Sequence, residues 1–256
     1  YLVSIAEKII RRNPKHITFI APFTVYFLCL FAGTAHIVYS LLPIIAEVSA
    51  KKRIRPERPL SISVIASHMA LTGSPMSAAT ASLAAILMYS TAVVDIMKVC
   101  IPACLIGIAA GVFSVWKKGK ELNDDPEFIE KMKDPVFAES IDKTSESNRE
   151  LKPGAKTAVF IFGSAILLII FFGAFPQFLP NVGAGAAGFA VGADGAVNLT
   201  GLIIMITLSA SALIMIITKT SAVSVSKMSL FTSMATAVVS VLGVVWMSAT
   251  FMGANE

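Results

Sequence analysis

Long apolar runs with few or no charges constrain this chain more than any other feature of its sequence. The clearest runs cover residues 94–116, 157–179, 199–218 and 230–251. A helix needs about 20 apolar residues to cross the hydrocarbon core of a bilayer, and each run reaches that length. Only 14% of the residues are charged, whereas about a quarter are charged in soluble domains, so the chain lacks the polar surface that water requires. We therefore predict an all-α integral membrane protein.

Two further apolar stretches, 17–49 and 60–94, are interrupted near their centres by short polar segments. The sequence reads Gly-Thr-Ala-His at 33–36 and Thr-Gly-Ser-Pro at 72–75. Glycine and proline are the residues that most strongly break or end a helix. The sequence therefore predicts one helical hairpin with a polar tip and one discontinuous helix.

Basic clusters at 11–16 and 51–58 flank the first interrupted stretch. Because cytoplasmic loops are rich in Lys and Arg, both clusters are expected on the cytoplasmic side, so the stretch 17–49 must return to the side it entered from. Each arm has about 16 residues, or about 24 Å of helix, which is short for a full crossing. We therefore predict a re-entrant hairpin whose tip lies near the middle of the membrane.

The remaining loops follow the same charge rule. The broken helix 60–94 would cross outward and the span 94–116 would return, which places the polar loop 117–156 in the cytoplasm. The Gly- and Ala-rich connection 180–198 would lie outside, and the connection with Lys219 and Lys227 inside. Since cytoplasmic loops account for the net charge of +5, we expect no nucleic-acid partner.

The two interruptions form the candidate substrate site. Non-helical backbone at membrane depth persists only where it is buried in protein or lines a watery cavity. The N-terminal end of a half-helix carries partial positive charge and free N–H groups, which can bind a carboxylate, whereas freed carbonyls and hydroxyls can bind Na⁺. The alternative is that Gly and Pro only kink ordinary spanning helices. The candidate substrate-binding residues are Gly33, Thr34, His36, Thr72, Gly73, Ser74 and Pro75.

Catalytic and metal-binding patterns are not found in the sequence. None of the common nucleophile, zinc or nucleotide-binding motifs occurs, so we predict neither an enzyme nor an organic cofactor or metal site. The three cysteines lie inside apolar runs and are expected to pack there. His68 is likewise expected to pack inside the bundle. His36 either contacts substrate, carries a proton or makes a structural hydrogen bond.

Several segments resemble the anaerobic C4-dicarboxylate transporter (Dcu) family of bacteria. The most specific is IRPERPLSISVIASHMALTGSPMSAATASLAAIL at 54–87, supported by RNPKHITFIAPF at 12–23 and GTAHIVYSLLPII at 33–45. The resemblance implies an inner-membrane carrier that exchanges or takes up fumarate, succinate, malate or aspartate. It also implies that the chain is a fragment of a longer inverted-repeat transporter. More distantly, the Gly-Thr-Ala-His tip resembles the hairpin tips of the wider ion-transporter superfamily, and that resemblance assigns substrate or cation binding to the seven residues above. Arg55 and Arg58 would set the topology or attract dianions.

These observations predict a secondary transporter of C4-dicarboxylates that works by alternating access. Coupling to Na⁺ or H⁺, assembly as a homo-oligomer and association with a sensor kinase are left open by the sequence. One alternative is a transporter of another anion, such as citrate or an inorganic oxyanion. Another is a membrane sensor or scaffold that uses the loop 117–156 as its docking surface.

Overall fold

Helices make up nearly all of the chain that the structure describes. The computed structural model describes residues 2–87, 91–134, 154–183, 195, 197 and 199–254. The longer helices are α1 (Leu2–Arg12), α2 (Ile17–Ala32), α3 (Leu42–Lys51), α4 (Glu57–Gly73), α5 (Ala78–Leu87), α6 (Ala92–Val115), α9 (Ala155–Ala174), α10 (Leu199–Thr218) and α12 (Ser229–Ala254). The short ones are η1 (Pro14–His16), η2 (Ala35–Ser40), η3 (Leu122–Asp124), α7 (Pro126–Lys131), η4 (Pro176–Phe178) and α11 (Ala222–Ser226). The predicted all-α class is confirmed.

Four helical stretches in the described residues are long and apolar enough to cross a membrane. They are Pro14–Ala32, Ala92–Val115, Ala155–Ala174 and Gly201–Thr218. Large apolar side chains project outward from these stretches; Phe160 on α9, for example, is 76% exposed. Side chains of this kind face lipid in a membrane protein. The chain is therefore a multi-pass membrane protein.

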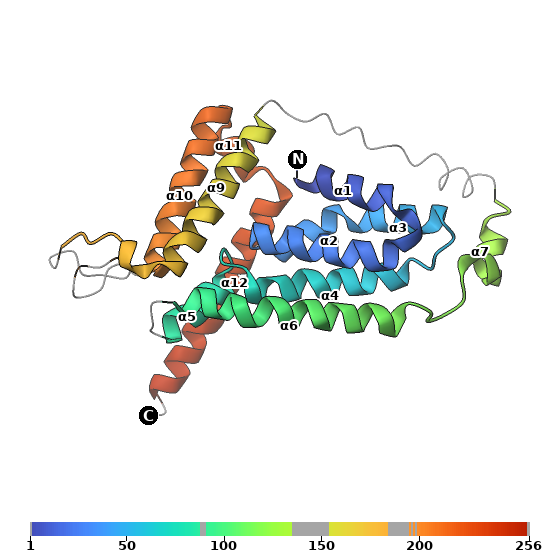
Figure 1. The fold of residues 1–256 in the computed structure, drawn as a ribbon, viewed down its shortest axis with the longest axis horizontal. Helices are drawn as coiled ribbons and strands as arrows, with labels where there is room; N and C mark the ends of the chain where they lie inside the picture. The colour runs from blue at the N-terminus through green and yellow to red at the C-terminus, as the bar shows by residue number, and fades with distance from the viewer. Residues whose placement is uncertain are drawn as a thin grey trace.

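Helices α2, α4 and α6 lie side by side and form the main bundle, with α1 and α3 packed against it (Figure 1). Ala66 and Ala70 of α4 are fully buried, and small residues of this kind let neighbouring helices approach closely in membranes. Helices α9 and α10 pair with each other, and they touch the bundle mainly through α5 and α6. Because α2 and α3 come from the segment 17–49 and α4 comes from the segment 60–94, both interrupted segments contribute helices to the bundle.

Both α2 and α4 begin at one end of the bundle, here called the basic end. Phe19 near the start of α2 stacks edge-on against Trp116, just beyond α6, with ring centroids 5.4 Å apart. Arg58 at the start of α4 donates to the Trp116 carbonyl oxygen at 3.0 Å. The Arg11 guanidinium, just before the hairpin, pairs with both carboxylate oxygens of Glu47 at 3.0 Å. The segment 17–49 thus returns to the end where it started, and its depth in a bilayer stays a prediction.

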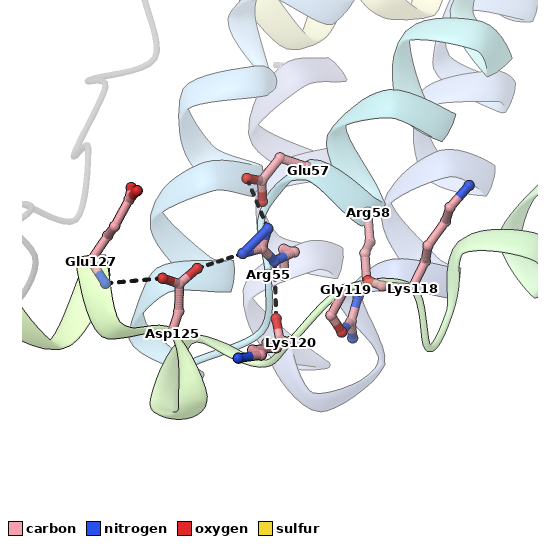
Figure 2. A network of polar contacts seen from close by, with 8 residues as sticks. All are labelled: Arg55, Glu57, Arg58, Lys118, Gly119, Lys120, Asp125 and Glu127. Atoms are coloured by element: carbon pink, nitrogen blue, oxygen red, sulfur yellow. Dashed lines mark hydrogen bonds and ion pairs between the residues drawn. The ribbon is translucent and has the colours of Figure 1, made fainter.

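Two arginines, here called the arginine clamp (Arg55 and Arg58), hold the start of α4 against the end of α6 (Figure 2). The Arg58 side chain is only 6% exposed. It donates to the carbonyl oxygens of Trp116, Lys118 and Gly119 at 3.0, 2.7 and 2.8 Å, and to the Glu121 carboxylate at 2.6 Å. Trp116 is the C-cap of α6, and Lys118 and Gly119 follow it, so Arg58 caps the helix end and holds the chain that leaves it. Its donors are engaged within the protein, which argues against the idea that Arg58 attracts dianions.

Arg55 extends the clamp into the polar loop. Its Nε donates to the Lys120 carbonyl oxygen at 2.9 Å, and its guanidinium also pairs with Asp125, which caps α7 by accepting from the Glu127 N–H at 3.1 Å. The hydrogen bond from Arg55 holds the pKa of Asp125 below its ordinary value. The start of the predicted loop 117–156 is therefore folded against the basic end. Residues 135–153 of that loop, and most of the connection 180–198, lie outside the described residues.

Candidate functional site

The first break (residues 33–36) ends α2 at a left-handed glycine. Gly33 has φ +67° and donates its N–H to the Cys29 carbonyl oxygen at 2.9 Å, which closes the helix. Thr34 then adopts an extended conformation, and its Oγ1 accepts a hydrogen bond from the His36 N–H at 3.3 Å. Glycine adopts positive φ without strain, whereas other residues rarely do. The helix therefore stops here instead of kinking.

The second break (residues 74–77) separates α4 from α5. Ser77 starts α5 by accepting from the Thr80 N–H at 3.1 Å, and its hydroxyl donates to the Leu71 carbonyl oxygen at 2.5 Å. Thr80 Oγ1 also donates to this carbonyl, at 3.2 Å. Hydroxyl groups thus satisfy backbone carbonyls that the interrupted helix leaves without partners. The predicted discontinuity of the segment 60–94 is present at this point.

The two breaks contact each other directly. The buried Ser74 hydroxyl donates to the Leu30 carbonyl oxygen at 2.6 Å and accepts from the Met76 N–H at 3.3 Å. A Cβ added to Gly33 would lie only 2.7 Å from the Met76 Cβ, so the backbones meet at van der Waals distance. Interruptions that lie about 40 residues apart in the chain therefore form one structural unit.

Helix α6 shows how deep this unit lies in the bundle. A Cβ added to Gly73 would meet the Ile101 and Cys100 side chains at 3.0 and 3.6 Å. These two residues lie about 13 Å from the start of α6 and about 21 Å from its end, at 1.5 Å per residue. If α6 crosses a bilayer, the joined breaks therefore lie inside the membrane, away from both of its surfaces.

A cavity of about 340 Å³ opens beside the joined breaks, within the range of small-molecule sites. It is lined by Gly33, Thr34, Ala35, His36, Tyr39, His68, Leu71, Ser77, Ala79 and Val238. Of the predicted site residues, Gly33, Thr34 and His36 therefore line it. Gly73, Ser74 and Pro75 are buried outside the lining, where Ser74 supports the joint.

Two side chains lie elsewhere than the sequence suggested. Thr72 does not line the cavity: its hydroxyl donates to the Met69 carbonyl oxygen at 2.7 Å and lies 3.4 Å from Cys104 Sγ on α6. His68 is exposed and lines the cavity, so the expectation that it packs inside the bundle is wrong. The signal that could have found His68 is helical spacing, because residues three apart on a helix share a face and Leu71 also lines the cavity.

Polarity in the cavity comes from neutral groups and a helix end. Ser77 and Ala79, at the start of α5, both line it. The first N–H groups of a helix carry partial positive charge, and in α5 Ser77 already accepts from that of Thr80, so the N–H groups before Thr80 are the ones that favour an anion. No Lys, Arg, Asp or Glu occurs among the lining residues within the described part of the chain. An anion entering here would meet hydroxyls, imidazoles and backbone N–H groups.

Ser74→Ala tests whether the joint depends on its buried hydrogen bond. We expect a loss of about 1–3 kcal/mol in the free energy of unfolding, because the buried Leu30 carbonyl would lose its donor. Thermal unfolding of the purified protein in detergent measures this loss. Ser114→Ala is the matched control, since that serine is exposed and bonds only locally to Gly111 at 2.7 Å. Equal melting of both variants would contradict the structural role of Ser74.

Interrupted membrane helices that meet beside a polar cavity are the architecture of secondary transporters. A family model described as "Anaerobic c4-dicarboxylate membrane transporter" matches residues 1–256. The chain belongs to this family. It is 37% identical to the anaerobic C4-dicarboxylate transporter DcuB of Escherichia coli O6:H1, over 99% of the chain and 56% of that protein. It is 36% identical to the C4-dicarboxylate transporter DcuA of Wolinella succinogenes, over 98% of the chain and 55% of that protein.

The chain spans about half the length of the curated relatives it matches. DcuA of Escherichia coli K12, for example, is 32% identical to it over 56% of that protein. No solved structure matches the chain. The family and these relatives are named as transporters and not as enzymes, in agreement with the sequence-based prediction.

Proposed function

We propose that the chain supplies a substrate half-site of a secondary transporter for C4-dicarboxylates such as fumarate, succinate, malate and aspartate. The observation that carries this proposal is the contact of two broken helices beside a polar cavity, where Ser74 Oγ lies 2.6 Å from the Leu30 carbonyl oxygen. The names of the relatives supply the substrate class. We also propose a location in the inner membrane of a bacterium.

In this proposal one substrate carboxylate binds at the first turn of α5, near Ser77. The partial positive charge of the helix end replaces a buried Lys or Arg. The other carboxylate lies toward Thr34 and His36 at the opposite break. Binding at both breaks would bias the protein between its inward- and outward-facing states, because a ligand shifts an equilibrium only through differential affinity.

Exchange is the proposed mode, because trading one dianion for another keeps the charge balanced. Coupling to a cation is the rival mode. The Ser74 and Ser77 hydroxyls already donate to the carbonyls of Leu30 and Leu71. A Na⁺ ion bound by these oxygens would have to displace both hydrogen bonds, which supports exchange or proton coupling over Na⁺ coupling at this point.

Uptake of radiolabelled fumarate into vesicles that contain the product of the complete gene tests the proposal. The vesicles are preloaded with succinate or left empty, with and without a Na⁺ gradient. Exchange predicts uptake that requires internal succinate. Absence of fumarate uptake under every condition would contradict the C4-dicarboxylate proposal, and uptake of citrate or an inorganic oxyanion instead would identify a different anion.

Thr34→Val is expected to reduce fumarate uptake about tenfold. The change removes both a hydroxyl that lines the cavity and the cap that accepts from the His36 N–H, and loss of one cap or one hydrogen bond costs about 1–2 kcal/mol. The control is Thr236→Val on α12, where the exposed hydroxyl bonds to Thr232 one turn earlier. If both variants transport like the wild type at equal membrane expression, Thr34 is not part of the site.

A further inference from the structure

The cavity contains two histidines, His36 from η2 and His68 from α4. Among the lining residues that the structure describes, they and Tyr39 are the only titratable side chains. A dicarboxylate dianion would therefore find no permanent positive charge there. Histidine is the side chain that gains a positive charge between about pH 8 and about pH 5, so the charge of this cavity depends on protons.

The hydrogen bonds of His68 determine which ring nitrogen faces a ligand. Its Nδ1 lies 3.0 Å from the Val64 carbonyl oxygen and 3.3 Å from Ser67 Oγ. A carbonyl oxygen can only accept, so Nδ1 must carry a hydrogen. In the neutral ring Nε2 is then an acceptor, which cannot bind a carboxylate. Protonation of Nε2 converts it into a charged donor, the form that binds carboxylates most strongly.

His36 occupies the other side of the same space. Its backbone N–H is held by Thr34 Oγ1 at 3.3 Å, and its ring lies 6.0 Å from that of Tyr39. These contacts fix the position of the residue at the start of η2. No hydrogen bond to the His36 ring nitrogens is found among the described residues, so both remain available to a ligand.

Charged side chains on the neighbouring helices do not supply the cavity with a positive charge in place of the imidazoles. Helices α2, α5, α10 and α12 contain no Asp, Glu, Lys or Arg. On α4, Glu57 and Arg58 lie at the opposite end, about 15 Å or more from His68 along the axis. On α6, Asp95 and Lys98 pair with each other at 3.0 Å. On α3, Glu47 pairs with Arg11 and Lys51.

From this geometry we infer that His68, together with His36, makes dicarboxylate binding proton-linked. The dianion binds more tightly when the imidazoles are protonated, and by reciprocity its binding draws protons into the cavity. This inference rests on the proposed function, and it makes His68 a further substrate-contacting residue. It assigns charge recognition at the half-site to two titratable rings.

The test measures fumarate binding to the purified product of the complete gene from about pH 5.5 to about pH 8, a range in which carboxylic acids of this kind stay ionised. We expect the wild type to bind about five- to tenfold more tightly at the acid end, because the hydrogen bond from Nε2 to the carboxylate exists only in the protonated ring and one hydrogen bond contributes about that much. His68→Gln should lose most of this dependence. His16→Gln should keep it, because that exposed histidine lies at the basic end, away from the cavity.

Proton uptake provides a second readout on the unaltered protein. Calorimetric titration with fumarate in two buffers of different ionisation heat should show protons taken up on binding by the wild type. Equal affinity across the pH range without proton uptake would overturn the inference even if His68→Gln fails to fold. A pH dependence that persists in His68→Gln would also overturn it. Absence of fumarate binding at every pH would instead overturn the proposed function, and this inference with it.

Discussion

Gly33→Val is expected to reduce substrate uptake at least about thirtyfold. Gly33 has φ +67°, and a Cβ there would lie 2.7 Å from Met76 Cβ and 2.9 Å from its carbonyl carbon. The left-handed conformation costs a residue with a side chain about 1–2 kcal/mol. Overpacking against backbone adds about 1–3 kcal/mol, and the β-branch of valine prevents an easy escape. Separation of the two breaks would relieve this strain but would also disrupt the site. A strain of about 2 kcal/mol relieved in this way accounts for a thirtyfold loss of uptake.

The measurement is fumarate uptake into vesicles with matched membrane expression of the wild type and the variant. Gly163→Val on α9 is the control, because a Cβ added to Gly163 meets no atom within 4 Å. The control should transport like the wild type. Undiminished uptake by Gly33→Val would show that close contact between Gly33 and Met76 is not needed for transport.

The helices and their breaks were predictable because their signals are local. An apolar run of membrane length excludes most other structures wherever it occurs. Gly33 and the Gly73–Pro75 segment end their helices through their own backbone preferences. These features need no knowledge of neighbours in space, and the structure shows helix ends at both predicted positions.

The contact between the breaks was not predictable in the same way. The hydrogen bond from Ser74 to Leu30 joins residues 44 positions apart, and sequence patterns do not specify which helix faces meet. For the same reason Thr72 was expected at the site but lies against Cys104 on α6. His68 was expected in the bundle, yet it is exposed and lines the cavity beside the second break.

Arg58 shows the same limit at the basic end. The positive-inside rule explains on which side of the membrane an arginine belongs. It does not reveal that α6 ends next to α4, so that the side chain of Arg58 is buried among three carbonyl oxygens. A residue that sequence patterns assign to topology therefore also has a capping role.

Arg58→Met is expected to lower the free energy of unfolding by about 3 kcal/mol. The methionine can fill part of the buried volume but leaves the carbonyls of Trp116, Lys118 and Gly119 without their charged donor, and hydrogen bonds to charged groups each contribute about 1.5–3 kcal/mol. Water at the membrane surface replaces some of these bonds, which keeps the total below their sum. Thermal unfolding in detergent measures the loss, and faster proteolysis within residues 117–128 should accompany it.

Two further variants separate charge from geometry. Arg12→Met removes the same charge from an exposed position at the same end of the bundle and should melt like the wild type. Arg58→Lys keeps the charge, but an ammonium group lacks the planar fork that reaches several carbonyls at once, so its melting temperature should lie between those of Arg58→Met and the wild type. If Arg58→Lys melts like the wild type, charge alone stabilises the end of α6. If Arg58→Met does so too, Arg58 contributes nothing to stability, and α4 is held in register with α6 by Arg55 and the apolar contacts of the bundle.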